Sequence, residues 1–239
     1  MSPRVDEIGF GGLKLLQDPS QFCYGVDAVL LADFCRARED DNVCELGSGN
    51  GAVSLIISAK YHPAHITGVE LQKGPYELSV ESAKLNGLDD RVEFLNCDIL
   101  DLKGRLRCGS MDLVVTNPPY IEKGRGFISC ESPQSLARHE SSACLQDFMN
   151  EAARLLRCGG RLCMVHRPSR LPDITENARA AGLEPKKLVP VAPKKGEPSN
   201  IILIECIKGA GKGLQVMAEV VIREPDGSFT EELKRIYSR

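Results

Sequence analysis

An apolar strand that runs into a glycine-rich loop and then into a helix is the feature that most constrains the fold. The strand occupies residues 42–46, the loop contains Gly47, Gly49 and Gly51, and the helix follows over residues 52–60. Glycines at this spacing let the backbone turn sharply and approach a ligand closely. Such a loop follows the first strand of a doubly wound sheet and binds a nucleotide-like ligand. The pattern therefore predicts an α/β fold with a ligand-binding loop.

Short apolar runs rich in β-branched residues predict the other strands. Helical patterns alternate with most of them, which is typical of a parallel, doubly wound sheet. The last two strands are expected to form an antiparallel pair that closes the sheet. The sequence thus predicts an α/β, Rossmann-like fold with a mostly parallel seven-stranded sheet. Its strands are expected at 42–46, 65–69, 92–97, 111–116, 161–165, 187–191 and 200–206, and its further helices at 75–86, 145–157 and 169–181.

The two ends of the chain are expected to flank this core within one domain, 1–239. Residues 8–24 predict an N-terminal hairpin, because Asp-Pro-Ser at 18–20 supplies a turn between two apolar runs. Asp27 is expected to cap a helix over residues 28–35. We therefore divide the domain into a hairpin and helix (1–35), a catalytic core (42–207) and a C-terminal extension (208–239). Glycines mark the start of this extension as a loosened segment, and a short helix is expected near its end.

Side chains at the carboxyl ends of successive strands are candidates for binding a cofactor. Glu70 ends the second strand about twenty residues after the glycines, where an acidic residue accepts hydrogen bonds from ribose hydroxyls. Asp98, at the end of the third strand, is placed to accept a hydrogen bond from an adenine amine, with Ile99 packing on the ring. Glu45 and Leu71 adjoin the glycine loop and Glu70, and belong to the same candidate site. Because the ends of these strands meet at one edge of the sheet, the sequence predicts one ligand site there.

The stretch Asn117-Pro118-Pro119-Tyr120 directly follows the strand at 111–116. Two prolines stop the strand and stiffen the chain, because neither has an N–H and both fix φ near −65°. The amide oxygen of Asn117 and the carbonyl of Pro118 then offer two acceptors, one for each N–H of a planar –NH2 group. Tyr120 offers a flat face for stacking. The stretch is therefore the candidate catalytic site.

Two neighbouring segments are candidates for completing this site. The N-terminal segment either caps the sheet as a flap or closes over the cofactor with Phe22, Tyr24 and Asp27. Residues 121–140 lack a clear period and are expected to form a lid or a substrate-contact loop. This loop ends at Arg138 and His139, which contact phosphate, orient the loop, or only lead into the next helix.

Composition and charge narrow the functional classes. A net charge of −3 gives no overall attraction to nucleic acid. The ten cysteines include no Cys-x-x-Cys pair, and several fall in apolar runs. This favours reduced core thiols in a cytoplasmic protein over a zinc site or a disulfide framework. The cysteine spacing therefore gives no reason to expect a metal. No run is long enough to span a membrane, so we expect no membrane partner either.

Several of these motifs resemble known enzymes. Asn-Pro-Pro-Tyr after an apolar strand resembles the signature of amino-methyltransferases, which act on adenine, guanine or glutamine –NH2 groups. Glu-Leu-Gly-Ser-Gly-Asn-Gly looks like the S-adenosylmethionine loop of class I methyltransferases. Over nearly its full length the chain resembles the bacterial tRNA1(Val) adenine-37 amino-methyltransferases. The segments that carry this resemblance are 11–17, 22–34, 45–51, 117–120, 137–140 and 226–237.

The resemblance implies that S-adenosylmethionine is the cofactor and that a tRNA is the substrate. The expected reaction is methylation of the exocyclic amine of an adenine in the anticodon loop, at position 37 of a valine tRNA. It assigns catalysis to Asn117, Pro118, Pro119 and Tyr120. The residues expected to contact the RNA are Tyr120, Lys123, Arg138 and His139, and local basic clusters must hold the RNA because the total charge is acidic. The oligomeric state is left open.

Three other functions compete with this interpretation. A glutamine methyltransferase acting on release factors would meet the same –NH2 geometry, but those enzymes carry a helical domain ahead of the core, and only about forty residues precede the glycine loop here. A guanine methyltransferase of ribosomal RNA usually has a duplicated domain, and no such duplication is expected in this chain. A catalytically silent RNA-binding module is the alternative outside enzymes, and the intact Asn117 and glycines argue against it.

Overall fold

The computed structural model describes residues 3–8, 10–19, 23–118 and 143–238. Its central sheet contains the seven predicted strands in the order β5-β4-β3-β6-β7-β9-β8. Strands β3 to β7 are parallel, whereas β9 runs antiparallel between β7 and β8. This confirms the predicted doubly wound fold with an antiparallel closing pair. The strands are β3 (Asn42–Leu46), β4 (His65–Glu70), β5 (Val92–Asn96), β6 (Met111–Thr116), β7 (Leu156–His166), β8 (Leu183–Lys194) and β9 (Ile201–Lys208).

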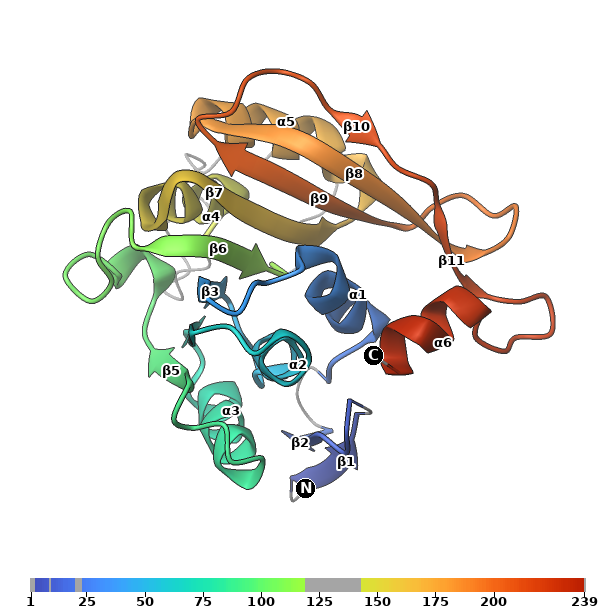
Figure 1. The fold of residues 1–239 in the computed structure, drawn as a ribbon, viewed down its shortest axis with the longest axis horizontal. Helices are drawn as coiled ribbons and strands as arrows, with labels where there is room; N and C mark the ends of the chain where they lie inside the picture. The colour runs from blue at the N-terminus through green and yellow to red at the C-terminus, as the bar shows by residue number, and fades with distance from the viewer. Residues whose placement is uncertain (1–2, 9, 20–22, 119–142, 239) are drawn as a thin grey trace, which may run out of the picture.

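Helices cover both faces of this sheet (Figure 1). Along each strand the side chains alternate between the two faces, so Val43 packs into one core cluster and Cys44 into the other. Leu113 and Val114 of β6 divide in the same way. The first face packs against α1 (Val26–Cys35), α2 (Ala52–Tyr61) and α3 (Lys73–Leu85), and the second against α4 (Leu145–Leu155), α5 (Leu171–Ala180) and the short helix η1 (Ile99–Asp101).

The parallel strands end in register. Leu46 of β3 lies opposite Val69 of β4 and Thr116 of β6, and Glu70 lies opposite Asn96 of β5. The residues that follow these strands therefore meet at one edge of the sheet, as the sequence predicted.

The N-terminal hairpin exists, but its position was predicted wrongly. It pairs β1 (Arg4–Glu7) with β2 (Lys14–Gln17), so the turn lies between these strands and not at residues 18–20. Phe10 and the two following glycines have positive φ angles, which glycine adopts without strain. The helix after the hairpin also begins earlier than expected: Gly25 is its N-cap, so Asp27 lies within the first turn of α1 and does not cap it.

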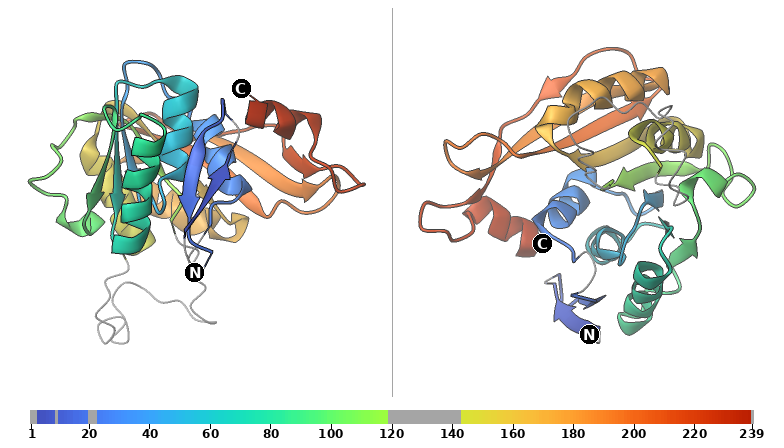
Figure 2. Two further views of the ribbon diagram at one scale, coloured as in Figure 1. Left: turned by 90° about the horizontal axis from the view of Figure 1, so that it is seen from below. Right: turned by 180° about the vertical axis from the view of Figure 1, so that it is seen from behind.

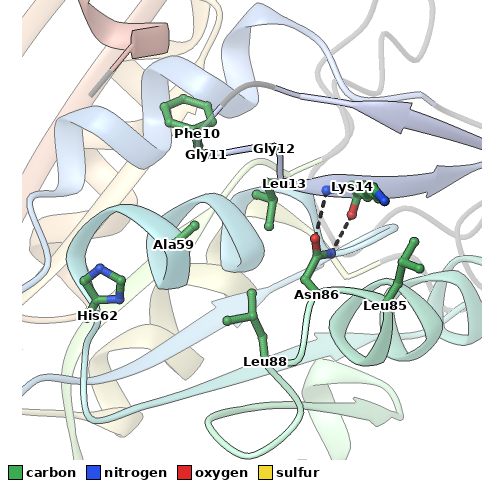
Figure 3. A pocket seen from close by; sticks show the side chains of 10 residues that line it. All are labelled: Phe10, Gly11, Gly12, Leu13, Lys14, Ala59, His62, Leu85, Asn86 and Leu88. Carbon is green, nitrogen blue, oxygen red and sulfur yellow. Dashed lines mark hydrogen bonds between the residues drawn. The ribbon is translucent and has the colours of Figure 1, made fainter.

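The hairpin packs between α3 and the C-terminal helix α6 (Glu231–Ser238), as both panels of Figure 2 show. The side chain of Asn86, at the end of α3, makes two hydrogen bonds to the backbone of Lys14, at 2.9 and 2.6 Å. These bonds border a cavity of about 410 Å³ between the hairpin turn and the C-terminal ends of α2 and α3 (Figure 3). The ring of Phe10 stacks on Tyr237 of α6, with centroids 6.2 Å apart. The two ends of the chain thus pack together on one face of the core.

The C-terminal extension begins outside any strand or helix, at residues 209–214, and then adds to the sheet. Two short strands, β10 (Gln215–Val216) and β11 (Val220–Arg223), pair in parallel with β8 and enlarge the sheet to nine strands. Gly209, Gly211 and Gly213, which mark the expected loosened segment, precede these strands and lie outside any strand or helix. Strand β7 also begins five residues earlier than predicted, because α4 ends at Leu155.

Most of the described cysteines are free thiols, and Cys35, Cys44, Cys163 and Cys206 are buried in the core. These free core thiols agree with the expectation of reduced thiols in the core. Cys144, outside the core, is disulfide-bonded. The described residues contain no group of side chains suited to a metal ion. Within the same residues, no helix has the length and apolar character to cross a membrane.

Candidate active site

The glycine loop crosses from the end of β3 to the start of α2 and is tied to the neighbouring strand. The backbone N–H groups of Gly47 and Ser48 both donate to the carbonyl of Val69, at 2.9 Å each. All three loop glycines have positive φ, at 74°, 54° and 82°. Residues with a Cβ are strained in this backbone conformation, which explains the glycine at each position.

Two of these glycines differ in what surrounds them. A Cβ on Gly51 would lie 2.7 Å from the ring of Phe94 and 2.9 Å from Ser79, so this glycine permits close packing of α2 on the sheet. A Cβ on Gly49 would meet no atom within 4 Å among the described residues. Gly49 therefore borders open space at the edge of the sheet, where a ligand can approach its backbone.

Glu70 is fixed beside this open space. Its Oε2 accepts a hydrogen bond from the N–H of Gly49 at 2.8 Å, and its Oε1 accepts one from the N–H of Gln72 at 2.7 Å. The residue is only 7% exposed. A carboxylate has about four lone-pair sites, so each oxygen can still accept a hydrogen bond from a ligand hydroxyl. The geometry fits the role in ribose binding that the sequence predicts.

Glu45 points into the protein. It is 1% exposed, and its Oε2 accepts hydrogen bonds from both the N–H and the hydroxyl of Ser54 in the first turn of α2. Burial raises the pKa of the carboxyl group to about 8. Glu45 thus holds the helix that follows the glycine loop, and its direct contact with a cofactor stays a prediction.

Two exposed leucines flank the ends of β4 and β5. Leu71 is 48% exposed and Leu100 is 49% exposed, whereas the predicted ring-packing residue Ile99 is 6% exposed. Asp98 accepts a hydrogen bond from the N–H of Leu100 at 3.0 Å and begins the η1 helix. Exposed apolar side chains suit the two faces of a planar ring. Sequence analysis missed Leu100, whose only signal was its place two residues after Asp98.

Asn96 fixes this part of the site from β5 and was also missed. Its amide donates to the carbonyls of Glu70 and Leu71, at 2.9 and 3.0 Å. The ends of β4 and β5 are therefore cross-linked by one side chain, which fixes the backbone on which Leu71 stands.

The candidate catalytic stretch begins beside the glycine loop. The hydroxyl of Thr116 donates to the carbonyl of Leu46 at 2.8 Å, which fixes the end of β6 against the end of β3. The amide of Asn117 then donates from Nδ2 to Oδ2 of Asp27 at 3.3 Å. Pro118 is buried. The other candidates at this end of the site lie outside the described residues, namely Phe22, Pro119, Tyr120, Lys123, Arg138 and His139.

The end of β7, next to β6, carries basic residues that sequence analysis did not single out. Arg167 is exposed, and Arg170, in the short helix η2 (Pro168–Arg170), pairs with Asp173 at 2.6 Å. The last residue of β7 is the buried His166, whose Nδ1 accepts the Arg167 N–H at 2.8 Å. Burial, followed by the charges of Arg170 and Arg167, lowers the pKa of His166 to about 4. His166 is therefore neutral at pH 7, and the positive charge at this edge comes from the arginines.

The glycine loop also contains buried polar groups that no described residue satisfies. Ser48 Oγ and Asn50 Nδ2 are buried, and neither has a hydrogen-bond partner among the described residues. A polar ligand at the loop could satisfy such groups, whose burial without a partner is otherwise unfavourable. These donors, the carboxylate of Glu70 and the open space at Gly49 together fit a nucleoside-containing cofactor.

Comparisons with known proteins give a consistent result. A protein-family model described as a methyltransferase domain matches residues 37–205. The tRNA1(Val) (adenine(37)-N6)-methyltransferase of Actinobacillus pleuropneumoniae is 25% identical over 88% of this chain and 86% of that protein. Among solved structures, a predicted O-methyltransferase from Agrobacterium tumefaciens has a TM-score of 0.72 at 22% identity, covering 88% of this chain and 95% of the other. The structure of M. jannaschii TYW2 in complex with AdoMet has a TM-score of 0.61 at 14% identity, covering 86% and 85%.

Proposed function

The chain belongs to the methyltransferase-domain family, and on that premise we propose that it methylates the exocyclic amine of an adenine in a tRNA anticodon loop, using S-adenosylmethionine. By the names of its relatives, the proposed position is adenine 37 of a valine tRNA. The observation that carries the proposal is the meeting of Asn117-Pro118 with the glycine loop at the ends of neighbouring strands, held by the bond between Thr116 and Leu46.

The proposed cofactor site is the edge formed by the glycine loop and the ends of β4 and β5. Glu70 would accept hydrogen bonds from the ribose, while Leu71 and Leu100 would cover the faces of the adenine ring. S-adenosylmethionine supplies a methyl group bonded to a positively charged sulfur. Two backbone N–H groups hold the Glu70 carboxylate in place, so its side chain needs little rearrangement when the cofactor binds, which favours affinity.

Asn117 and Pro118 would orient the substrate amine. Its two N–H groups would donate to Oδ1 of Asn117 and to the carbonyl of Pro118, which directs the nitrogen lone pair toward the methyl group. The bound cofactor would supply the methyl group, with the new N–C bond formed as the S–C bond breaks, and the amine would then release a proton to water. Placement of the reacting atoms is the main contribution expected of the protein.

An anticodon loop suits this site physically. An adenine in a loop can be splayed out, whereas one in a duplex must first be unpaired and unstacked. The net charge of −3 means that local basic residues must hold the RNA phosphates. Arg167 and Arg170 at the end of β7, and Lys194 at the end of β8, lie at the same edge of the sheet as Asn117.

Substitution of Asn117 tests the proposal. In Asn117→Ala we expect transfer of labelled methyl groups to unmodified tRNA to fall below detection, while calorimetry shows S-adenosylmethionine affinity within about twofold of wild type. The matched control is Asn177→Ala, since this asparagine lies in α5, where its amide donates to the carbonyl of Asp173. Full turnover in Asn117→Ala would remove the residue from catalysis, and lost cofactor affinity would mean that it binds the cofactor instead.

A further inference from the structure

A carboxylate from the N-terminal part of the chain contacts the catalytic amide. Asp27 lies in the first turn of α1, 90 residues before Asn117, and its Oδ2 accepts the hydrogen bond from Asn117 Nδ2 at 3.3 Å. We propose that Asp27 is a positioning residue that fixes the orientation of the Asn117 amide, so that Oδ1 faces the substrate amine. This inference rests on the proposed function and assigns Asp27 a role other than the cofactor contact expected from the sequence.

The chemistry of the two groups decides which way the amide faces. An ionised carboxylate can only accept hydrogen bonds, whereas the asparagine amide has a donor side and an acceptor side. Rotating the amide by 180° would set its oxygen against the oxygens of Asp27, which is repulsive. The carboxylate therefore holds Nδ2 toward α1 and leaves Oδ1 on the other side. The opposite orientation would present N–H groups to the N–H groups of the substrate amine.

The local structure holds Asp27 in the position that this role requires. Its Oδ1 accepts a hydrogen bond from the N–H of Ala28 at 3.1 Å, so both oxygens are engaged. The positive end of the α1 dipole also favours a negative charge in this turn. A Cβ on Gly25 would lie 2.7 Å from Oδ1 of Asp27. Gly25 has an ordinary negative φ of −122°, so space for the Asp27 side chain, and not backbone strain, explains this glycine.

A purely structural role for Asp27 predicts a different outcome. An acidic residue in the first turn stabilises a helix, and its loss would lower stability without a specific effect on turnover. Asp33 provides the matched comparison, because it is an acidic residue of the same helix with partners far from Asn117. Its Oδ1 accepts from Lys60 at 2.6 Å. Asp33→Asn therefore removes a carboxylate from α1 without touching the catalytic amide.

Kinetics on the full-length chain separate these roles. For Asp27→Ala we expect kcat to fall about 10- to 100-fold, as for loss of one charge-assisted hydrogen bond, with KM for the tRNA and the cofactor Kd within about twofold. Asp27→Asn should fall between this variant and wild type, because an amide can still accept from Asn117 but can also flip. Asp33→Asn should lower Tm and leave kcat unchanged. Unchanged kcat in Asp27→Ala would overturn the inference, and weakened cofactor binding with unchanged kcat would make Asp27 a cofactor ligand.

A spectroscopic readout tests the contact without any substrate. In protein labelled with 15N-asparagine, the side-chain NH2 signals of Asn117 are those missing from Asn117→Ala. They should shift in Asp27→Ala and stay in place in Asp33→Asn. Signals that do not move in Asp27→Ala would overturn the inference. If wild-type protein transfers no methyl group to tRNA, the proposed function fails, while this NMR comparison still decides whether Asp27 holds the amide.

Discussion

Gly49 and Gly51 lie in one loop, yet the structure predicts different consequences when each is replaced by alanine. Both have positive φ, at 54° and 82°, so either substitution adds backbone strain of about 1–2 kcal/mol. Only at Gly51 does the new methyl group also collide with the core. It would lie 2.7 Å from the Phe94 ring and 2.9 Å from Ser79, which are 7% and 0% exposed.

The collision sets the magnitude of the difference. Overpacking a core by one methyl group costs about 1–3 kcal/mol in addition to the strain. We therefore expect Gly51→Ala to lower the free energy of unfolding by about 2–5 kcal/mol and Gly49→Ala by about 1–2 kcal/mol. Because the open space at Gly49 belongs to the proposed cofactor site, Gly49→Ala should weaken S-adenosylmethionine binding at least about tenfold, or about 1.4 kcal/mol.

Urea unfolding of the two variants and wild type gives the stabilities, provided that the m-values agree. Calorimetry at a temperature where all three proteins are folded gives the cofactor affinities. Equal losses of stability in the two variants would refute the steric argument. Wild-type affinity in Gly49→Ala would show that the open side of the loop does not face the cofactor.

Two further predictions concern charge. Burial raises the folded pKa of Glu45 from 4.5 to about 8, so the folded protein keeps a proton that the unfolded chain releases, and stability should fall as pH rises through this window, by up to about 1.4 kcal/mol per pH unit. The pKa of His166 is lowered from 6.5 to about 4, so its contribution makes stability rise with pH below pH 6.5, and unfolding is best compared between pH 6.5 and 8. The loss of stability in this range should disappear in Glu45→Gln. An equal loss in that variant would contradict the assignment to Glu45. Arg167→Ala should raise KM for the tRNA and reduce the slope of log affinity against log salt by about 1. Arg38→Ala is the control, because Arg38 is also an exposed arginine. An unchanged slope in Arg167→Ala would show that Arg167 does not contact the RNA.

Local signals explain why the sheet and the core of the site were predictable. The glycines of residues 47–51, the acidic residue Glu70 and the stretch that begins at Asn117 each follow an apolar strand directly. Parallel strands that end in register bring such residues together without further information. The edge of the sheet was therefore predicted from patterns of about ten residues.

Features that depend on contacts between distant segments could not be predicted in this way. Strand β1 is mostly exposed and lacks an apolar alternation, so the stronger turn signal at residues 18–20 misplaced the hairpin. The strands β10 and β11 form because β8 extends beyond its apolar centre and offers an edge. No local pattern connects Asp27 with Asn117, whose contact depends on packing of α1 against the ends of the strands.

The most direct test of the account is transfer of a labelled methyl group from S-adenosylmethionine to defined acceptors. Wild-type protein is incubated separately with an unmodified valine tRNA transcript, ribosomal RNA fragments and a release factor, and the labelled position is mapped by mass spectrometry. We expect label only in the tRNA, on the amine of the adenine at position 37, the position that the relatives' names give. Replacing that adenine should abolish the label. Label in the release factor or the ribosomal RNA but not in the tRNA would contradict the proposed substrate, and label that persists without the adenine would contradict the proposed position.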